Sequence, residues 1–354
     1  MAKDGNCTKL SKRILYITPG FPADELDSTC IPALQEFLLE ISKNLGGQQI
    51  ISLNYPGAGD YKWFEHSVKS LGWNNPVKVQ KVWLLNFALP ALQKFVDENS
   101  FDLIHSFWMT DASLIGAKLA SYAQVPHVVT IMGQDVKPNL LFKRILRSKP
   151  KLIALSAFQE RLVRSYGQTA VIPWGLSDHW FPREINKGEV DIVTVGSLID
   201  VKRPEQLLTI VAHLKNDFPA IRAAFIGDGP NRKFLENKSI ALGLQDNIEF
   251  LGELNRSDVL GHIAKAKLLF HPSRYEGFGM VIIEALALGA QPIAYSTGVA
   301  GEIDKVIIIN STDEAVQVAG SYLAGKLPAL QYHSDYAISK TVEKYKRLYN
   351  KLLE

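Results

Sequence analysis

The feature that most constrains the fold is a regular alternation of short apolar runs with helical patterns, which stops and then starts again. In the first half, RILYIT is followed by PALQEFLLEISKNL, and DLIHSFW is followed by ASLIGAKLASYAQ. Alternation of this kind predicts parallel strands with helices on both faces of the sheet. Turn formers and charges fill residues 173–190, and the alternation then resumes with DIVTVGS. We therefore expect an α/β chain with two domains.

The length of 354 residues is sufficient for two domains that each bury a hydrophobic core. We expect an N-terminal Rossmann-like domain over 1–180, a C-terminal one over 190–334, and a final helix over 335–354 that crosses back to the N-terminal domain. Open parallel sheets bind ligands at the carboxyl ends of their strands. Two such sheets facing each other would form a cleft with one ligand on each side.

The composition is that of a globular protein, with 47% hydrophobic and 21% charged residues and no apolar run near the roughly 18 residues that span a bilayer. The first residues, MAKDGNCTKLSKR, lack the apolar core of a secretory signal. Cys7 and Cys30 are too few for a disulfide framework or a thiolate metal site. We expect a cytoplasmic protein, with the inner face of the membrane as the alternative location.

Positive charge is concentrated in the first half of the chain. Residues 1–185 carry 20 Lys and Arg against 16 Asp and Glu, whereas 186–354 carry 19 against 20, and all six tryptophans lie between 63 and 180. Within 137–164 the one acid is Glu160, and the basic residues are Lys137, Lys143, Arg144, Arg147, Lys149, Lys151, Arg161 and Arg164. A solvated helix face is the ordinary interpretation of such a run. The alternative is peripheral binding to anionic lipid, at about 1 kcal/mol per basic residue. We expect no nucleic-acid partner.

The stretch Arg274–Gly289, RYEGFGMVIIEALALG, predicts a sugar-nucleotide site. The strand KLLFHPS ends at Ser273, and a helix begins near Gly279. Glu276 therefore lies at the carboxyl end of a strand, and Glu284 lies about one turn into the helix. A helix amino terminus binds anions, and a carboxylate accepts hydrogen bonds from vicinal hydroxyls. A sugar joined to a diphosphate uses both kinds of chemistry.

Each glutamate alone has a plain alternative as a solvated charge, but the surrounding sequence adds a resemblance. Residues 273–289 resemble the paired-glutamate motif (Glu, seven residues, Glu) of retaining GT-B glycosyltransferases, particularly family four. The segments VGSLIDVKRPEQLL (195–208), FIGDGPNRKFLE (225–236) and IEFLGEL (248–254) stand in that family's order and spacing. The resemblance is strong over about 190–305 and weak over the N-terminal half. It implies the GT-B fold, in which two Rossmann-like domains face each other across a cleft.

The resemblance also implies roles for the matching residues. Glu276 would contact the transferred sugar and Glu284 the nucleotide ribose, while the backbone of Gly277, Phe278 and Gly279 would meet sugar and phosphate. Two of these three residues are glycines, so no Cβ would obstruct that approach.

A basic pair clamps the diphosphate in the resembled family. Lys202 matches its lysine, whereas Ser197 stands where its arginine is expected, and Arg203 or Arg274 would substitute. The other donor-binding positions that the resemblance implies are Gly227, Gly229 and Leu254.

The N-terminal half departs from the family on the acceptor side. Ser28 and Thr29 occupy about the place of a glycine pair, where their hydroxyls would bind phosphate or sugar or else cap a turn. The family's His-Gly-x-Asp stretch appears here as MGQD, which makes Asp135 the leading candidate for acceptor contact, beside Gly133. His105 either faces the cleft or is a satisfied core histidine.

The expected activity is transfer of a sugar from a nucleoside diphosphate sugar to an acceptor hydroxyl, with retention implied by the resemblance, in polysaccharide, lipopolysaccharide or glycolipid synthesis. The expected catalytic residues are Glu276, Lys202 and Asp135. The histidines are scattered and no carboxylates cluster at metal-ligand spacing, so we expect neither a metal nor a cofactor. The alternatives are a nucleotide-sugar 2-epimerase and an inactive sugar-nucleotide binding protein.

Overall fold

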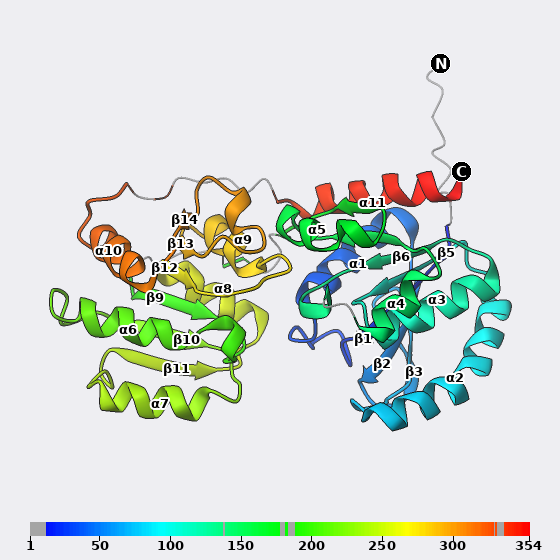
Figure 1. Cartoon of the computed structure of the whole chain (residues 1–354), viewed down its shortest axis with the longest axis horizontal. Coiled ribbons are helices and arrows are strands. Elements are labelled where there is room, and N and C mark those ends of the chain that lie inside the picture. Colours follow the sequence, from blue (N-terminus) through cyan, green and yellow to red (C-terminus); the bar gives the residue numbers. More distant parts are fainter. Residues whose placement is uncertain (1–11, 137–138, 178–180, 183–187, 329, 331–335) are drawn as a thin grey trace, which may run out of the picture. The chain divides into compact units, whose positions relative to one another are not determined.

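The computed structural model describes residues 12–136, 139–177, 181–182, 188–328, 330 and 336–354, and the chain divides into two compact units (Figure 1). Unit 1 comprises Met1–Ala154, Leu162–Gly175 and Ile338–Glu354, and unit 2 comprises Leu155–Arg161 and Leu176–Ala337. The expected N-terminal domain included Leu155–Arg161. The structure assigns this segment to unit 2, where the Ser156 hydroxyl donates to the Gly277 carbonyl at 2.7 Å.

Unit 1 is built on an eight-stranded sheet with the order β3-β4-β2-β1-β5-β6-β7-β8. Its strands are β1 (Ile14–Gly20), β2 (Gln49–Tyr55), β3 (Gly59–Trp63), β4 (His66–Ser70), β5 (Leu103–Phe107), β6 (His127–Thr130), β7 (Lys151–Ala154) and β8 (Thr169–Val171). Its helices are α1 (Pro32–Leu45), α2 (Lys78–Asn99), α3 (Asp111–Ala123), α4 (Leu140–Leu146) and α11 (Ile338–Leu353), while α5 (Ala157–Val163) spans the boundary between the units. All neighbouring strands are parallel except β3 and β4.

Successive side chains of β1 point to opposite faces of this sheet and separate two helical layers. Leu15 and Ile17 pack in one cluster with α2 and α3. Tyr16 points to the other face, where its ring contacts Phe37 of α1, which in turn contacts Tyr345 of α11. Both faces of the sheet are therefore covered, as the apolar character of the strands requires.

The β3–β4 hairpin at the sheet edge was not expected from the sequence. Its residues, GDYKW and HSVKS, are largely polar, so they carry no apolar run of the kind that marks the buried strands. Phe64, in the turn between them, has a φ of 49°. The hairpin extends the sheet by pairing β4 parallel to β2.

The final helix, α11, belongs to unit 1 although it follows unit 2 in the chain. It packs on α1, and the Thr341 hydroxyl donates to the Pro173 carbonyl at 2.8 Å. Buried polar contacts from Tyr345 and Tyr349 fix it further (see below).

Unit 2 is built on a six-stranded parallel sheet with the order β11-β10-β9-β12-β13-β14. Its strands are β9 (Val190–Val195), β10 (Ala223–Ile226), β11 (Ile248–Gly252), β12 (Ala266–His271), β13 (Gln291–Ala294) and β14 (Ile307–Ile308). Its helices are α6 (Glu205–Leu214), α7 (Arg232–Ala241), α8 (Arg256–Lys265), α9 (Met280–Ala287) and α10 (Thr312–Leu323). The prediction of two parallel-sheet α/β domains is therefore confirmed.

Candidate functional site

The carboxyl end of β12 leads through residues 272–279 into α9. β12 lies between β9 and β13, and all of its side chains except Lys267 are buried. Gly279 precedes the helix with a φ of 96°, a left-handed conformation that favours glycine. Gly279 has no side chain with which to cap this helix end, and the first N–H groups of a helix attract anions.

Glu276 lies buried in this loop and is 9% exposed. Its Oε1 is 2.8 Å from Nε2 of His271, the last residue of β12. The same oxygen pairs with the ammonium of Lys202, the last residue of the short 3-10 helix η4 (Asp200–Lys202). Two segments far apart in the sequence thus deliver nitrogen donors to one carboxylate oxygen.

These two partners set the charge of Glu276. Burial by itself raises the pKa of a carboxyl, because it disfavours the charged form. The charge and hydrogen bond of His271, followed by those of Lys202, outweigh burial and lower the pKa of Glu276 to about 2. Glu276 is therefore an ionised carboxylate at neutral pH. Sequence reasoning missed His271, although its place five residues before Glu276 at a strand end was a usable signal.

A backbone contact brings Lys202 to the loop, because the Arg274 N–H donates to the Val201 carbonyl at 2.8 Å. The two arginines considered as substitutes for the clamp lie differently. Arg203 places its guanidinium over the ring of Tyr295, 4.8 Å from the centroid, and Arg274 is exposed. Their role as substitutes stays a prediction.

Glu284, in α9, is 2% exposed and pairs with a residue that the sequence did not indicate. Its Oε1 is 2.6 Å from Nη1 of Arg256, the first residue of α8, which is also buried. The pair joins the two helices through charges withdrawn from water. The plain alternative of a solvated helix charge is wrong for Glu284, since a carboxylate this deeply buried needs a cation or donors beside it.

The backbone between the two glutamates is held from several sides. The Gly277 carbonyl accepts from Ser156, and the Phe278 carbonyl accepts from the Val299 N–H at 2.7 Å. The Phe278 ring is buried against Tyr336. These contacts leave the loop preorganised rather than free, and contact of its amides with a sugar or phosphate stays a prediction.

The two glycines of the GDGP turn approach another backbone closely. A Cβ on Gly227 would lie 2.3 Å from the Gly196 carbonyl oxygen, and one on Gly229 would lie 2.7 Å from that of Leu198. These glycines thus shape the loop that contains Ser197. Ser197 is exposed and Leu254 is half-buried after β11, so both positions are accessible in unit 2.

In unit 1, Asp135 is engaged by backbone. Its carboxylate accepts the N–H groups of Met109 at 2.7 Å and Gly133 at 2.6 Å, with Met132 at 3.4 Å. Burial raises the pKa of Asp135, and these hydrogen bonds offset the effect only in part. Asp135 therefore holds together the loops after β5 and β6, and its contact with an acceptor stays a prediction.

The hydroxyl of Thr29 donates to the Asp27 carboxylate at 2.9 Å. Asp27 also accepts the N–H groups of Ala23, Thr29 and Cys30. The turn-capping interpretation therefore holds for Thr29. Ser28 is buried beside it, and binding of a sugar or phosphate by Ser28 stays a prediction.

His105 is fully buried in the core of unit 1. Its Nδ1 lies 2.7 Å from the Tyr349 hydroxyl and its Nε2 lies 2.8 Å from Thr130 Oγ1, which in turn is 2.8 Å from the Tyr345 hydroxyl. This network fastens α11 to the sheet. The prediction of His105 as an acceptor-side residue is wrong, because its ring is enclosed and both nitrogens are occupied.

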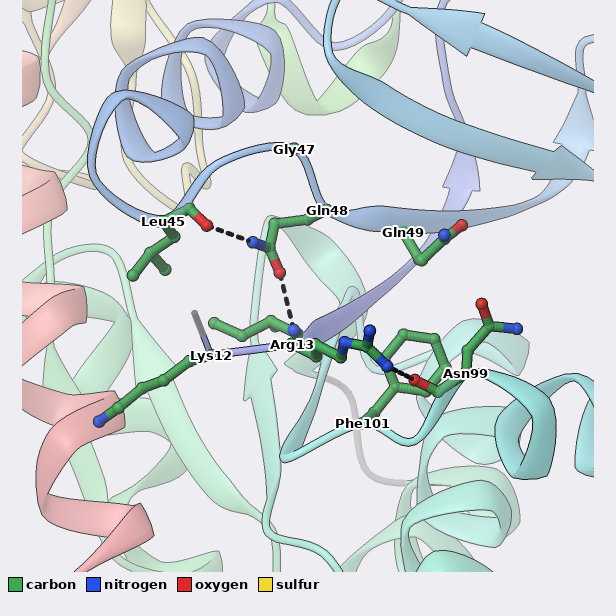
Figure 2. A pocket seen from close by; sticks show the side chains of 9 residues that line it. Lys12, Arg13, Leu45, Gly47, Gln48, Gln49, Asn99 and Phe101 are labelled. Atoms are coloured by element: carbon green, nitrogen blue, oxygen red, sulfur yellow. Dashed lines mark hydrogen bonds between the residues drawn. The ribbon is translucent and has the colours of Figure 1, made fainter. Parts of the chain in front are cut away.

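Figure 2 shows a pocket of unit 1 that lies at the opposite end of the strands. It is lined by Lys12, Arg13, Ile14, Leu45, Gly47, Gln48, Gln49, Asn99 and Phe101, at the amino ends of β1 and β2. Its two cations are engaged, since Arg13 donates to the Asn99 carbonyl and Lys12 to the Asn350 side chain, both at 2.6 Å. Ligands of open parallel sheets bind at the carboxyl ends, so this pocket is not the predicted acceptor site.

Neither a cluster of metal ligands nor a membrane-spanning helix is present among the described residues. No three His, Cys, Asp or Glu side chains among them come together as metal ligands. No helix in the described part is long and apolar enough to cross a bilayer. Activity without a metal stays a prediction.

Comparisons with known proteins match both halves of the chain. The family model of glycosyl transferases group 1 matches residues 178–306, and that of glycosyl transferase 4-like proteins matches residues 49–158. An uncharacterized glycosyltransferase of Methanocaldococcus jannaschii is 26% identical over 253 residues, which is 68% of this chain and 69% of the relative.

Solved structures agree on the fold. Sucrose-phosphate synthase from Thermosynechococcus elongatus has a TM-score of 0.72 at 16% identity, over 97% of this chain and 95% of that one. The Anabaena protein HepE in complex with UDP has a TM-score of 0.63 at 16% identity, over 96% and 97%. The paired glutamates of unit 2 lie inside the matched region, and the chain belongs to the group 1 glycosyltransferases with the GT-B fold.

Proposed function

We propose that this glycosyltransferase moves a sugar, with retention of anomeric configuration, from a nucleoside diphosphate sugar to an acceptor hydroxyl. The observation that carries the proposal is the ionised, buried Glu276, held with Lys202 at the carboxyl end of β12 in front of the amino terminus of α9. A carboxylate, a cation and open backbone N–H groups together suit a hydroxyl-rich sugar joined to a diphosphate.

The donor would divide its groups among these residues. The diphosphate attracts Lys202 and the N–H groups at the start of α9, and Glu276 accepts hydrogen bonds from sugar hydroxyls. Glu284 would meet the ribose with its second oxygen, while Arg256 keeps the first. The HepE structure, which contains UDP, supports a nucleoside diphosphate as the donor's leaving group.

Lys202 is the cation that neutralises Glu276. When the diphosphate enters, Lys202 can turn to its oxygens, and His271 remains as the hydrogen-bond partner of Glu276. Lys202 would then stand beside the group on which negative charge grows during the reaction. A cation placed where negative charge develops often contributes a large part of catalysis.

In the transfer step the bond between the anomeric carbon and the diphosphate oxygen breaks, and the electron pair leaves with the diphosphate. The acceptor oxygen forms the new bond on the same face of the sugar, and its proton passes to the departing phosphate oxygen. No protein base is needed in this scheme. We propose that the reaction needs neither a metal nor a cofactor.

We place the enzyme in the cytoplasm, and the acceptor in polysaccharide, lipopolysaccharide or glycolipid synthesis. A 2-epimerase would isomerise a nucleotide sugar without an acceptor. An inactive binding protein would retain the sugar nucleotide without turnover. Incubation of the protein with nucleotide sugars alone, watched for an isomer, separates the first alternative from transfer.

The test of the proposal is donor-dependent transfer by wild-type protein, Glu276→Gln and Glu276→Ala across a panel of acceptors. We expect wild-type turnover, and a loss of about 100-fold or more in both variants. Transfer unchanged in Glu276→Ala would refute the role of Glu276. Binding of donor without turnover for every acceptor would support the inactive protein instead.

A further inference from the structure

Large apolar side chains are exposed to solvent along the first half of α2. Trp83 is 76% exposed and Phe87 is 87% exposed, and Val77, just before the helix, is 66% exposed. Trp83 and Phe87 are four residues apart, so they share one face of the helix. The opposite face of the helix packs against the core of unit 1, where Leu92 and Val96 are buried. The exposed face therefore offers a second apolar surface.

Basic side chains are exposed on and after α4. The exposed cations are Lys143, Arg144, Arg147, Lys149 and Arg164, and Leu140 at the start of the helix is 79% exposed. Phe142 and Ile145 of α4 are fully buried in a core cluster of unit 1. Its outer side therefore carries positive charges beside an exposed apolar side chain.

α2 and α4 lie on the two sides of α3, in one helical layer of unit 1 (Figure 1). α3 packs with α2 in one core cluster, and its Leu114 packs in the cluster of α4. α3 itself exposes Lys118 and Tyr122. We name the outer surface of these helices the aromatic-basic face, made of Trp83, Phe87, Lys118, Tyr122, Leu140, Lys143, Arg144 and Arg147.

The apolar part of this face lies toward the carboxyl ends of the strands. α2 begins after the carboxyl end of β4 and α4 after that of β6, so Trp83 and Leu140 are near the edge at which parallel sheets bind ligands. Of the acids on these helices, Asp97 and Glu98 lie at the other end of α2, where Asp97 accepts from the Tyr122 hydroxyl and Glu98 lies 3.7 Å from Lys94, and Asp111 is the first residue of α3.

We propose that the aromatic-basic face binds an anionic lipid surface and so presents the carboxyl edge of unit 1 to a lipid-borne acceptor. The lipid surface follows from charge complementarity and from the preference of Trp and Tyr for the membrane interface. The lipid-borne acceptor rests, in addition, on the proposed glycosyl transfer. A second copy fits less well, because a two-fold dimer through this face would bring the cations of two α4 helices together.

The test is flotation of the full chain with vesicles, without donor or acceptor present. We expect wild-type protein to float with phosphatidylcholine vesicles that contain phosphatidylglycerol and not with phosphatidylcholine alone, and to be released as salt screens the charges. Trp83→Ser/Phe87→Ser and Arg144→Glu/Arg147→Glu should each bind at least tenfold more weakly. All four positions are exposed, so the unfolding midpoints should stay near that of the wild type.

Matched controls come from unit 2. Phe234→Ser removes a 58% exposed aromatic side chain, and Lys233→Glu/Lys326→Glu reverses two exposed cations. Both controls should float like the wild type. Any of three results would overturn the proposal. The wild-type protein does not bind the anionic vesicles, or both face variants bind them as strongly as the wild type does. In the third, the unit 2 controls lose as much binding as the face variants. A wild-type dimer that both face variants convert to monomers would assign the face to a second copy. Because the assay contains no donor, its failure leaves the proposed transfer reaction untouched.

Discussion

Two carboxylates, Glu276 buried in unit 2 and Asp135 half-buried in unit 1, show how neighbours decide what a carboxylate can do. Glu276 in unit 2 is paired with Lys202 and His271, and its pKa is lowered to about 2. Asp135 in unit 1 accepts backbone N–H groups, and burial raises its pKa. Side-chain cations can move when a ligand arrives, whereas backbone amides cannot. Glu276 can therefore exchange a partner for a ligand, whereas Asp135 joins the loops after β5 and β6, and its contact with an acceptor stays a prediction.

The largest expected effect tests the unit 2 side of this comparison. Glu276→Gln keeps the size of the side chain and removes its charge, so kcat should fall by about 100- to 1000-fold. The comparison variant Asp135→Asn should lose less activity per folded molecule than Glu276→Gln, and a rise in its KM for the acceptor would support the predicted acceptor contact. Initial rates normalised to the folded fraction measure both. If both variants lose the same fraction of normalised activity, the two carboxylates do not differ in the way proposed.

The next effect concerns the second buried ion pair of unit 2. Arg256→Met leaves Glu284 charged and buried without its cation, so the free energy of unfolding should fall by roughly 3 kcal/mol. The double variant Arg256→Met/Glu284→Leu should recover part of the loss, because an apolar pair replaces the ionic one. Urea unfolding followed by circular dichroism gives both values. No recovery in the double variant would mean that the pair does not account for the loss.

Substituting Glu276 and substituting Asp135 should change the pH dependence of the unfolding free energy in opposite directions. The pKa of Glu276 falls from 4.5 to about 2, so its stabilising contribution is complete above pH 4.5 and is lost as the pH falls toward 2. The pKa of Asp135 is raised above 3.8, so its contribution is present below 3.8 and is lost as the pH rises through its folded value. Unfolding free energies between about pH 3 and 5 should rise with pH less steeply in Glu276→Gln and more steeply in Asp135→Asn. The same slope in both variants would contradict this assignment.

The smallest effect concerns the turn at Thr29. Thr29→Val removes one hydroxyl donor to Asp27, which keeps three backbone donors from this turn. The loss of stability should be about 1 kcal/mol or less, with transfer unchanged. If the variant is stable but has a raised KM for the acceptor, Thr29 contacts the acceptor.

The sequence predicts the parts of this molecule that follow local patterns. Alternating apolar runs predict the parallel strands of both units except β4 and β14, and the spacing of Glu276 and Glu284 predicts their place around α9. The partners His271 and Arg256 were missed because an ion pair between segments depends on packing, which no periodicity records. His105 was placed wrongly for a related reason: the return of the final helix was predicted, but no pattern along the chain reveals that Tyr349 of that helix contacts His105.

The most direct test of the account is calorimetric titration with UDP, GDP, ADP and their sugars. We predict that one nucleoside diphosphate family binds the wild type, that Lys202→Met weakens its binding by at least tenfold, and that Glu276→Gln leaves the affinity for the free diphosphate within about threefold. Lys202→Met that binds like the wild type, or no binding of any nucleoside diphosphate, would contradict the placement of the donor beside Glu276.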